Sequence, residues 1–114
     1  LLNPVFMSDA EKGAFVGGFD ANGLIMQGWV SEVRNLTRDP WLAAIALDTV
    51  GGGHSLERLV VSVLGEPQPK AGVDRARIAE MSLEQVAEYA VKDACCEFRL
   101  DVALQGRLEL GEYL

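Results

Sequence analysis

Residues 98–110 alternate between apolar and polar side chains almost without exception, which is the clearest pattern in the chain. Successive side chains of a β-strand point to opposite faces of a sheet, so the alternation predicts a strand with one buried and one solvated face. The chain is therefore expected to contain a β-sheet. The apolar positions are Phe98, Leu100, Val102, Leu104, Leu108 and Leu110, and the polar ones are Arg99, Asp101, Gln105, Arg107 and Glu109.

The N-terminal part of the chain predicts a β-hairpin. Two apolar runs, Lys12–Phe19 and Leu24–Val33, are separated by a short polar segment. Within that segment, Asn22 and Gly23 can supply the positive φ angles that a tight hairpin turn requires. We therefore expect the two runs to pair as neighbouring strands.

Residues 41–50 favour a short buried helix. Asp39 can cap the free N–H groups of a first helical turn, and Pro40 at the first helical position removes no bond that would otherwise form. Alanine is the strongest helix former, and three alanines lie in this segment. A buried strand over Ala43–Val50 is the competing interpretation.

Residues 56–64 leave the choice between helix and strand open. Ser55 could cap a helix that begins at Leu56. The run from Leu59 to Leu64 is rich in β-branched residues, which are typical of a strand. The following segment, Gly65–Gly72, contains two prolines and is expected to be a loop.

A long amphipathic helix is predicted from near Asp74 to Cys96. Ser82 and Gln85 have the spacing of a capping box, in which each side chain binds the other residue's backbone N–H. Apolar residues then recur every three or four positions, which places them on one face of a helix. These residues are Leu83, Val86, Ala87, Ala90, Val91, Ala94 and Phe98.

Together these elements predict a single α+β domain over residues 1–114. Its sheet would be small, mixed or antiparallel, and built from the N-terminal hairpin and the C-terminal strand. The long helix would cover one face of the sheet, with one or two shorter elements from Asp39–Leu64. A sheet of so few strands has exposed edges, which tend to be covered or paired, so a homodimer is expected.

Charge and hydropathy narrow the range of partners. The formal net charge is −7 and the pI is about 4.6, so the surface repels nucleic acid and anionic lipid. Hydrophobic residues make up 49% of the chain, which suits a soluble globular protein. No apolar run approaches the roughly 20 residues that a membrane span needs. Neither nucleic acid nor a membrane is therefore an expected partner.

The two cysteines are adjacent, at Cys95 and Cys96. Neighbouring cysteines rarely bridge each other because the ring would strain the peptide bond between them. Free thiols fit a reducing compartment, so a cytoplasmic location is expected. Cys95 falls on or beside the apolar helix face, and we expect it to be a buried, unreactive side chain. One histidine and this pair offer too few ligands for a metal site, so no metal or cofactor is predicted.

A glycine-rich segment is the first candidate binding site. Gly51, Gly52 and Gly53 precede His54 and Ser55, at the start of the possible helix 56–64. Free N–H groups at a helix N-terminus attract anions, and glycines allow a phosphate or carboxylate to approach closely. The hypothesis is a site for a small anionic ligand. The alternative is a connector between two elements, with Ser55 as a simple cap.

The second candidate site involves the two tryptophans, Trp29 and Trp41. Aromatic side chains anchor ligand pockets and protein interfaces, but they also fill cores. We expect at least one of the two to be part of the core.

Two functions remain open. The first is a non-catalytic binding or interaction module that acts as a homo-oligomer and uses Trp29 or Trp41. The second is a small enzyme or ligand-binding protein for an anionic metabolite at Gly51–Ser55. The sequence identifies no catalytic residue and leaves open whether the protein is an enzyme. The first function is preferred because groups suited to catalysis are so few.

Overall fold

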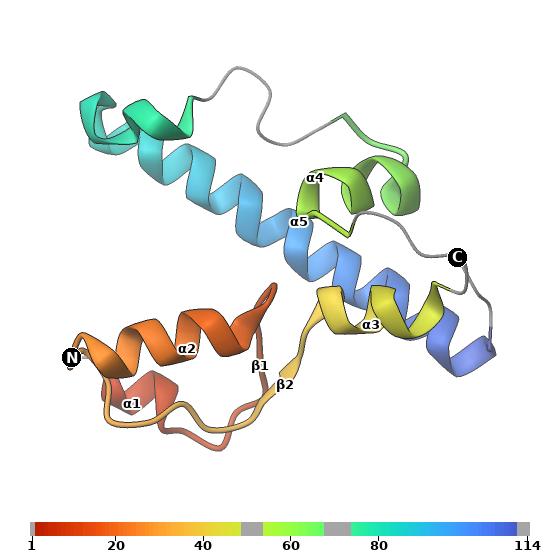
Figure 1. Cartoon of the computed structure of the whole chain (residues 1–114), viewed down its shortest axis with the longest axis horizontal. Helices are drawn as coiled ribbons and strands as arrows, with labels where there is room; N and C mark the ends of the chain where they lie inside the picture. Colours follow the sequence, from red (N-terminus) through yellow and green to blue (C-terminus); the bar gives the residue numbers. More distant parts are fainter. Residues whose placement is uncertain (1, 49–53, 68–73, 112–114) are drawn as a thin grey trace.

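The computed structural model describes residues 2–48, 54–67 and 74–111 (Figure 1). These residues form an α+β arrangement in which helices predominate. The helices are α1 (Asn3–Phe6), α2 (Gly17–Met26), α3 (Pro40–Leu47), α4 (Leu56–Leu59), a π-helical turn η1 (Val60–Leu64), a 3-10 segment η2 (Arg75–Glu80) and α5 (Leu83–Leu110). The strands are β1 (Lys12–Gly13) and β2 (Leu36–Arg38).

The sheet differs from the expected one in its strands and in their direction. β1 and β2 are its two strands within the described residues, and they run parallel, with Lys12 opposite Leu36 and Gly13 opposite Arg38. A parallel pair needs a crossover connection, because a tight turn can only reverse the chain. α2 lies in that connection, so the prediction of an antiparallel or mixed sheet was wrong.

The predicted C-terminal strand is helical, because residues 98–110 belong to α5. The alternating pattern also fits a helix, because a run with an apolar residue at every second position contains apolar pairs four residues apart. Such pairs lie on one helix face. Leu100 and Leu104 are fully buried on that face, whereas Phe98 is 70% exposed. No proline interrupts the helix, and it ends at Gly111, whose φ of 69° is the left-handed conformation typical of a helix end.

The predicted N-terminal hairpin is also wrong, since Gly17–Met26 form α2. Asn22 and Gly23 lie inside this helix and make no turn. A distant side chain caps the helix start: Asp39 accepts hydrogen bonds from the backbone N–H groups of Val16 (3.1 Å) and Gly17 (3.0 Å). Free N–H groups at a helix N-terminus need such an acceptor, so this contact stabilises the helix over the hairpin.

The helix predicted from residue 41 is confirmed as α3, which begins at Pro40 and ends at Leu47. The Asp39 carboxylate accepts the Trp41 N–H at 3.0 Å, as the capping argument required. Three carboxylate contacts therefore meet at Asp39, which joins the starts of α2 and α3.

Residues 56–64 are helical, which resolves the open choice against a strand. Ser55 caps α4 by accepting the Arg58 N–H at 3.3 Å. The capping box at the start of α5 is confirmed: Ser82 accepts the Gln85 N–H at 3.2 Å, and the Gln85 side chain accepts the Ser82 N–H at 3.0 Å.

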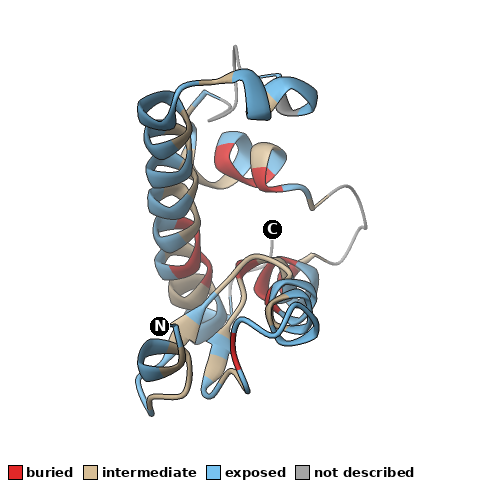
Figure 2. Ribbon diagram, turned by 90° about the vertical axis from the view of Figure 1, so that its left-hand side faces the viewer, coloured by how far each residue is buried: buried red, intermediate tan, exposed pale blue. Residues whose placement is uncertain are grey.

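The core lies where α3 and the α4–η1 segment pack against the C-terminal half of α5. Figure 2 shows buried positions in one half of the long helix, while its other half is exposed. Among the described residues, no helix is both long and apolar enough to cross a membrane. The buried apolar cluster consists of Ala43, Ala44, Leu47, Leu56, Leu59, Val60, Leu100 and Leu104.

Candidate functional site

The predicted anion site is only partly described. Gly51, Gly52 and Gly53 lie outside the described residues. His54 Nε2 lies 2.7 Å from Asp48 Oδ2, and both side chains are largely buried. This contact connects the residue that follows α3 to a residue two positions before α4. Ser55 uses its hydroxyl oxygen to cap α4. Binding of an anion here stays a prediction.

Neither tryptophan belongs to the buried cluster. Trp41 is half-buried in the first turn of α3, and Trp29 is exposed just beyond α2. The expectation that at least one would be a core residue was therefore wrong. Trp29 instead leaves most of its indole ring in solvent, which is an unusual position for so large an apolar side chain.

Trp29 lies on an apolar surface formed with α2, which we name the α2 surface: Phe19, Leu24, Met26 and Trp29. Phe19 is 79% exposed, Met26 86% and Trp29 63%. Phe19 and Met26 are seven residues apart, two helical turns, so they share one face of α2. A groove of about 400 Å³ lies between Phe19 and Trp29, and Asp20, Gly23, Leu24 and Gln27 complete its lining.

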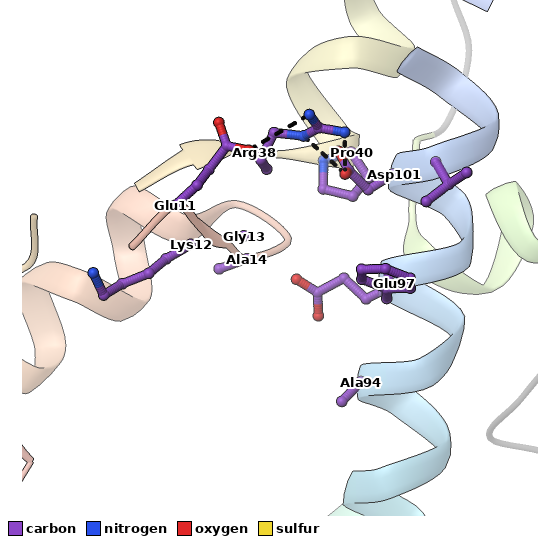
Figure 3. A pocket seen from close by; sticks show the side chains of 11 residues that line it. Glu11, Lys12, Gly13, Ala14, Arg38, Pro40, Ala94, Glu97 and Asp101 are labelled. Atoms are coloured by element: carbon purple, nitrogen blue, oxygen red, sulfur yellow. Dashed lines mark hydrogen bonds and ion pairs between the residues drawn. The ribbon is translucent and has the colours of Figure 1, made fainter. Parts of the chain in front are cut away.

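A larger pocket of about 450 Å³ lies between the β1–β2 pair and α5 (Figure 3). One side is the face of α5 from Ala94 to Val102, and the opposite side comes from β1, β2 and the start of α3. Its lining mixes apolar and charged side chains: Glu11, Lys12, Gly13, Ala14, Arg38, Pro40, Ala94, Glu97, Phe98, Asp101 and Val102.

Arg38 and Asp101 form the main ion pair of the pocket. Arg38 Nε and Nη2 lie 2.9 and 2.8 Å from Asp101 Oδ2, and Arg38 Nη1 lies 3.6 Å from Glu11 Oε1. The hydrogen bond from Arg38 to Asp101 holds the pKa of the guanidinium above its ordinary value. Asp101 is buried, and its Oδ1 has no hydrogen-bond partner. A buried acceptor without a donor is costly, and such groups often mark functional sites.

Glu97 carries a second charge into the same pocket. Figure 3 shows its carboxylate directed from α5 toward Gly13 and Ala14. Burial raises the pKa of Glu97 above the ordinary glutamate value, and the nearby charges of Asp93, Asp20 and Asp39 raise it further. A hydrogen bond from the backbone N–H of Phe15 acts in the opposite direction.

Lys12 does not balance these carboxylates. Its Nζ donates hydrogen bonds to the backbone carbonyls of Ser8 (2.8 Å), Ala10 (2.8 Å) and Arg34 (2.9 Å). Figure 3 shows its side chain pointing away from Glu97. The lining residues thus include three carboxylates against one guanidinium and one ammonium that is turned away, so the charge of the pocket is negative.

The cysteines have different surroundings. Cys95 is exposed, so the expectation that it would be buried was wrong. Cys96 is half-buried beside the core, and burial raises the pKa of its thiol. In residues 2–48, 54–67 and 74–111, no three His, Cys, Asp or Glu side chains are close enough to hold a metal ion.

The pocket was not found from the sequence because its walls come from segments far apart in the chain. Arg38 and Asp101 are 63 positions apart, and no local pattern connects them. The assumed C-terminal strand also placed Phe98 and Val102 on a buried face. A helical interpretation of residues 98–110 would have placed Ala94, Phe98 and Val102 on one stripe of α5.

No protein-family model, no curated protein and no solved structure matches this chain.

Proposed function

We propose that this chain is a non-catalytic interaction module that forms a homodimer through the α2 surface. The observation that carries the proposal is the exposure of Phe19, Met26 and Trp29, since Phe19 shares a helix face with Met26 and lines one groove with Trp29. Large apolar side chains gathered in one exposed patch mark interaction sites, whereas single exposed ones do not. Tryptophan is also among the residues that contribute most to binding energy at interfaces.

The α2 surface is suited to a second copy of itself. It presents protruding side chains, Phe19 and Met26, beside a groove lined by Phe19, Leu24 and Trp29. In a two-fold dimer the same patch on each copy meets its equivalent, so a projection and a groove must lie on one surface. This patch offers both.

Charge also favours a second copy at this place. The chain has a net charge of −7, so two copies repel each other over most of their surfaces. Within residues 17–29, Asp20 is the single ionisable side chain. The α2 surface is therefore nearly neutral, and two copies can meet there with little repulsion.

The wider setting follows from the same features. The net charge leaves nucleic acid and anionic membranes outside the proposed partners. The free thiols of Cys95 and Cys96 fit the reducing cytoplasm, which is the location we propose.

Sedimentation analysis of the purified chain tests the proposal. At micromolar concentration the wild type should sediment with a mass near twice the 12.3 kDa of one chain. Trp29→Ala should shift this mass toward the monomer. The control is Leu83→Ala, which removes an 80% exposed side chain in the first turn of α5 and should leave the dimer intact.

Two results would contradict the proposal. A wild-type monomer at all concentrations tested would remove self-association. A dimer that dissociates with Leu83→Ala and persists with Trp29→Ala would move the interface from α2 to α5.

A further inference from the structure

The pocket between α5 and the β1–β2 pair shares no lining residue with the groove on α2. A ligand in this pocket and a second copy on the α2 surface therefore use different residues. The side chains that line the pocket therefore determine what kind of ligand it could bind, independently of the α2 surface.

One stripe on the α5 side of the pocket is apolar, beside Glu97 and Asp101. Ala94, Phe98 and Val102 follow each other at intervals of four residues and form one stripe on α5. Phe98 leaves most of its ring in solvent, so the ring is available to cover an apolar body. The face of an aromatic ring also attracts a cation placed over it.

The charged groups of the pocket favour a cationic ligand. Both cations among the described lining residues are engaged elsewhere, Arg38 by Asp101 and Glu11 and Lys12 by three backbone carbonyls. The neighbouring charges that raise the pKa of Glu97 are those of Asp93, Asp20 and Asp39, all of them acidic. An anion would be repelled here, and a neutral group would leave the negative charge uncompensated.

The size and spacing of the groups favour an organic cation over a metal ion. No three acidic, histidine or cysteine side chains in the described ranges are placed to chelate a metal. The volume of about 450 Å³ instead accommodates a small molecule with several heavy atoms beyond its charged group.

We infer that this pocket binds a small organic cation, a protonated amine carried on an apolar body. The ammonium group donates hydrogen bonds to the Glu97 carboxylate, and the apolar body lies along Ala94, Phe98 and Val102. The negative charge near Glu97 attracts the ligand to this end of the pocket. Arg38, held by Asp101, bounds the other end.

The test is a calorimetric titration of the full chain with phenethylammonium, which combines a protonated amine with an aromatic body. Three further probes separate its parts: phenethyl alcohol lacks the charge, methylammonium lacks the apolar body, and hydrocinnamate carries the opposite charge. Phenethylammonium should bind saturably and more tightly than each of the other three.

Glu97→Gln removes the charge and keeps the shape of the side chain. It should weaken phenethylammonium binding about tenfold, which corresponds to about 1.4 kcal/mol. The control is Glu84→Gln on the same helix, about 20 Å away at about 1.5 Å per residue. This distance exceeds the screening length of about 8 Å at physiological salt, so the control should bind like the wild type.

Phe98→Ala tests the apolar wall. Because Phe98 is exposed, its replacement should leave the fold intact. The loss of the ring should weaken the binding of phenethylammonium and have little effect on the weaker binding of methylammonium. Thermal melting of each variant shows whether it is folded when it is titrated.

Three results would each overturn a different part of the inference. Equal binding of phenethyl alcohol would reduce the pocket to an apolar cavity. Unchanged binding in a folded Glu97→Gln variant would overturn the role of Glu97. Absence of saturable phenethylammonium binding to the wild type would overturn the inference as a whole. None of these results bears on self-association, because Trp29 and the rest of the α2 surface lie outside the pocket.

Discussion

Replacing Leu100 with alanine should destabilise the protein strongly. Leu100 is fully buried in the cluster where α3 packs on α5. Leucine-to-alanine changes in cores cost about 2–5 kcal/mol, and the cost rises with the cavity that remains. Ala43 and Ala44 of the same cluster have no long side chains to fill the space, so we expect about 3–4 kcal/mol.

The same loss can be expressed as a melting temperature. The entropy of unfolding is about 2.1 cal/mol/K per residue, or about 0.24 kcal/mol/K for 114 residues. A loss of about 3 kcal/mol therefore lowers Tm by about 12 °C. Far-UV circular dichroism during heating measures this shift, and urea unfolding gives the free energy independently.

Phe98→Ala is the matched control for Leu100→Ala. In a strand, side chains two residues apart share a face, so the two changes would cost similar amounts of stability. In α5, Phe98 is exposed and Leu100 is buried, so Phe98→Ala should change stability by no more than about 0.5 kcal/mol. Equal and large losses for both variants would refute the helical assignment of this segment.

Three further outcomes are expected. Glu97→Gln should raise Tm at pH 7, because the raised pKa of Glu97 means that its charged form destabilises the fold. The difference in Tm between variant and wild type should shrink as the pH falls toward about 4.3, the ordinary glutamate pKa. A difference that stays constant across pH would contradict this. Thiol labelling of the native protein should be fast at Cys95, which is exposed, and slower at Cys96, whose pKa is raised by burial; equal rates would be inconsistent with that burial. Truncation before Phe98 removes two fully buried leucines and should abolish the cooperative melt, since typical stability is only about 5–15 kcal/mol; a melt like that of the full chain would count against this core.

Capping residues were the part of the fold that could be predicted from the sequence. Asp39, Ser55 and Ser82 each bind a backbone N–H two or three positions further along the chain. Such contacts depend only on local spacing, so the residue types alone indicate them. The cap of α3 and the capping box of α5 were predicted correctly for this reason, and Ser55 was named as a possible cap although residues 56–64 were left open between helix and strand. The bounds of the long helix were not predicted, because it was expected from near Asp74 to Cys96 and α5 runs from Leu83 to Leu110.

The errors arose where distant contacts outweigh local preference. Asn22-Gly23 is a strong local turn signal, yet the Asp39 carboxylate binds the start of α2 from more than 20 positions away in the sequence. In residues 98–110, the two-residue alternation also contains the four-residue spacing of a helix, and continuation from Leu83 decides between them. Neither fact is visible in a short window.

The candidate sites were likewise predictable only where they depend on residue type or local spacing. Trp29 was identified from its residue type, because a large aromatic side chain is a candidate for either core or interface. Its exposure, which favours the interface, depends on the fold. The pocket at Glu97 needs segments near residues 11–14, 38–40 and 94–102 to meet, and no spacing rule predicts that meeting.

The proposal that two copies meet through the α2 surface is tested most directly by contacts between the copies. An isotope-filtered NOE experiment on a mixture of carbon-13-labelled and unlabelled chains detects contacts between copies only. In the proposed dimer we expect intermolecular NOEs from the Trp29 indole ring to the Phe19 ring and the Met26 methyl group. Intermolecular NOEs confined to exposed side chains of α5, such as Leu83 and Val91, or a complete absence of them at concentrations where the mass is that of a dimer, would contradict it.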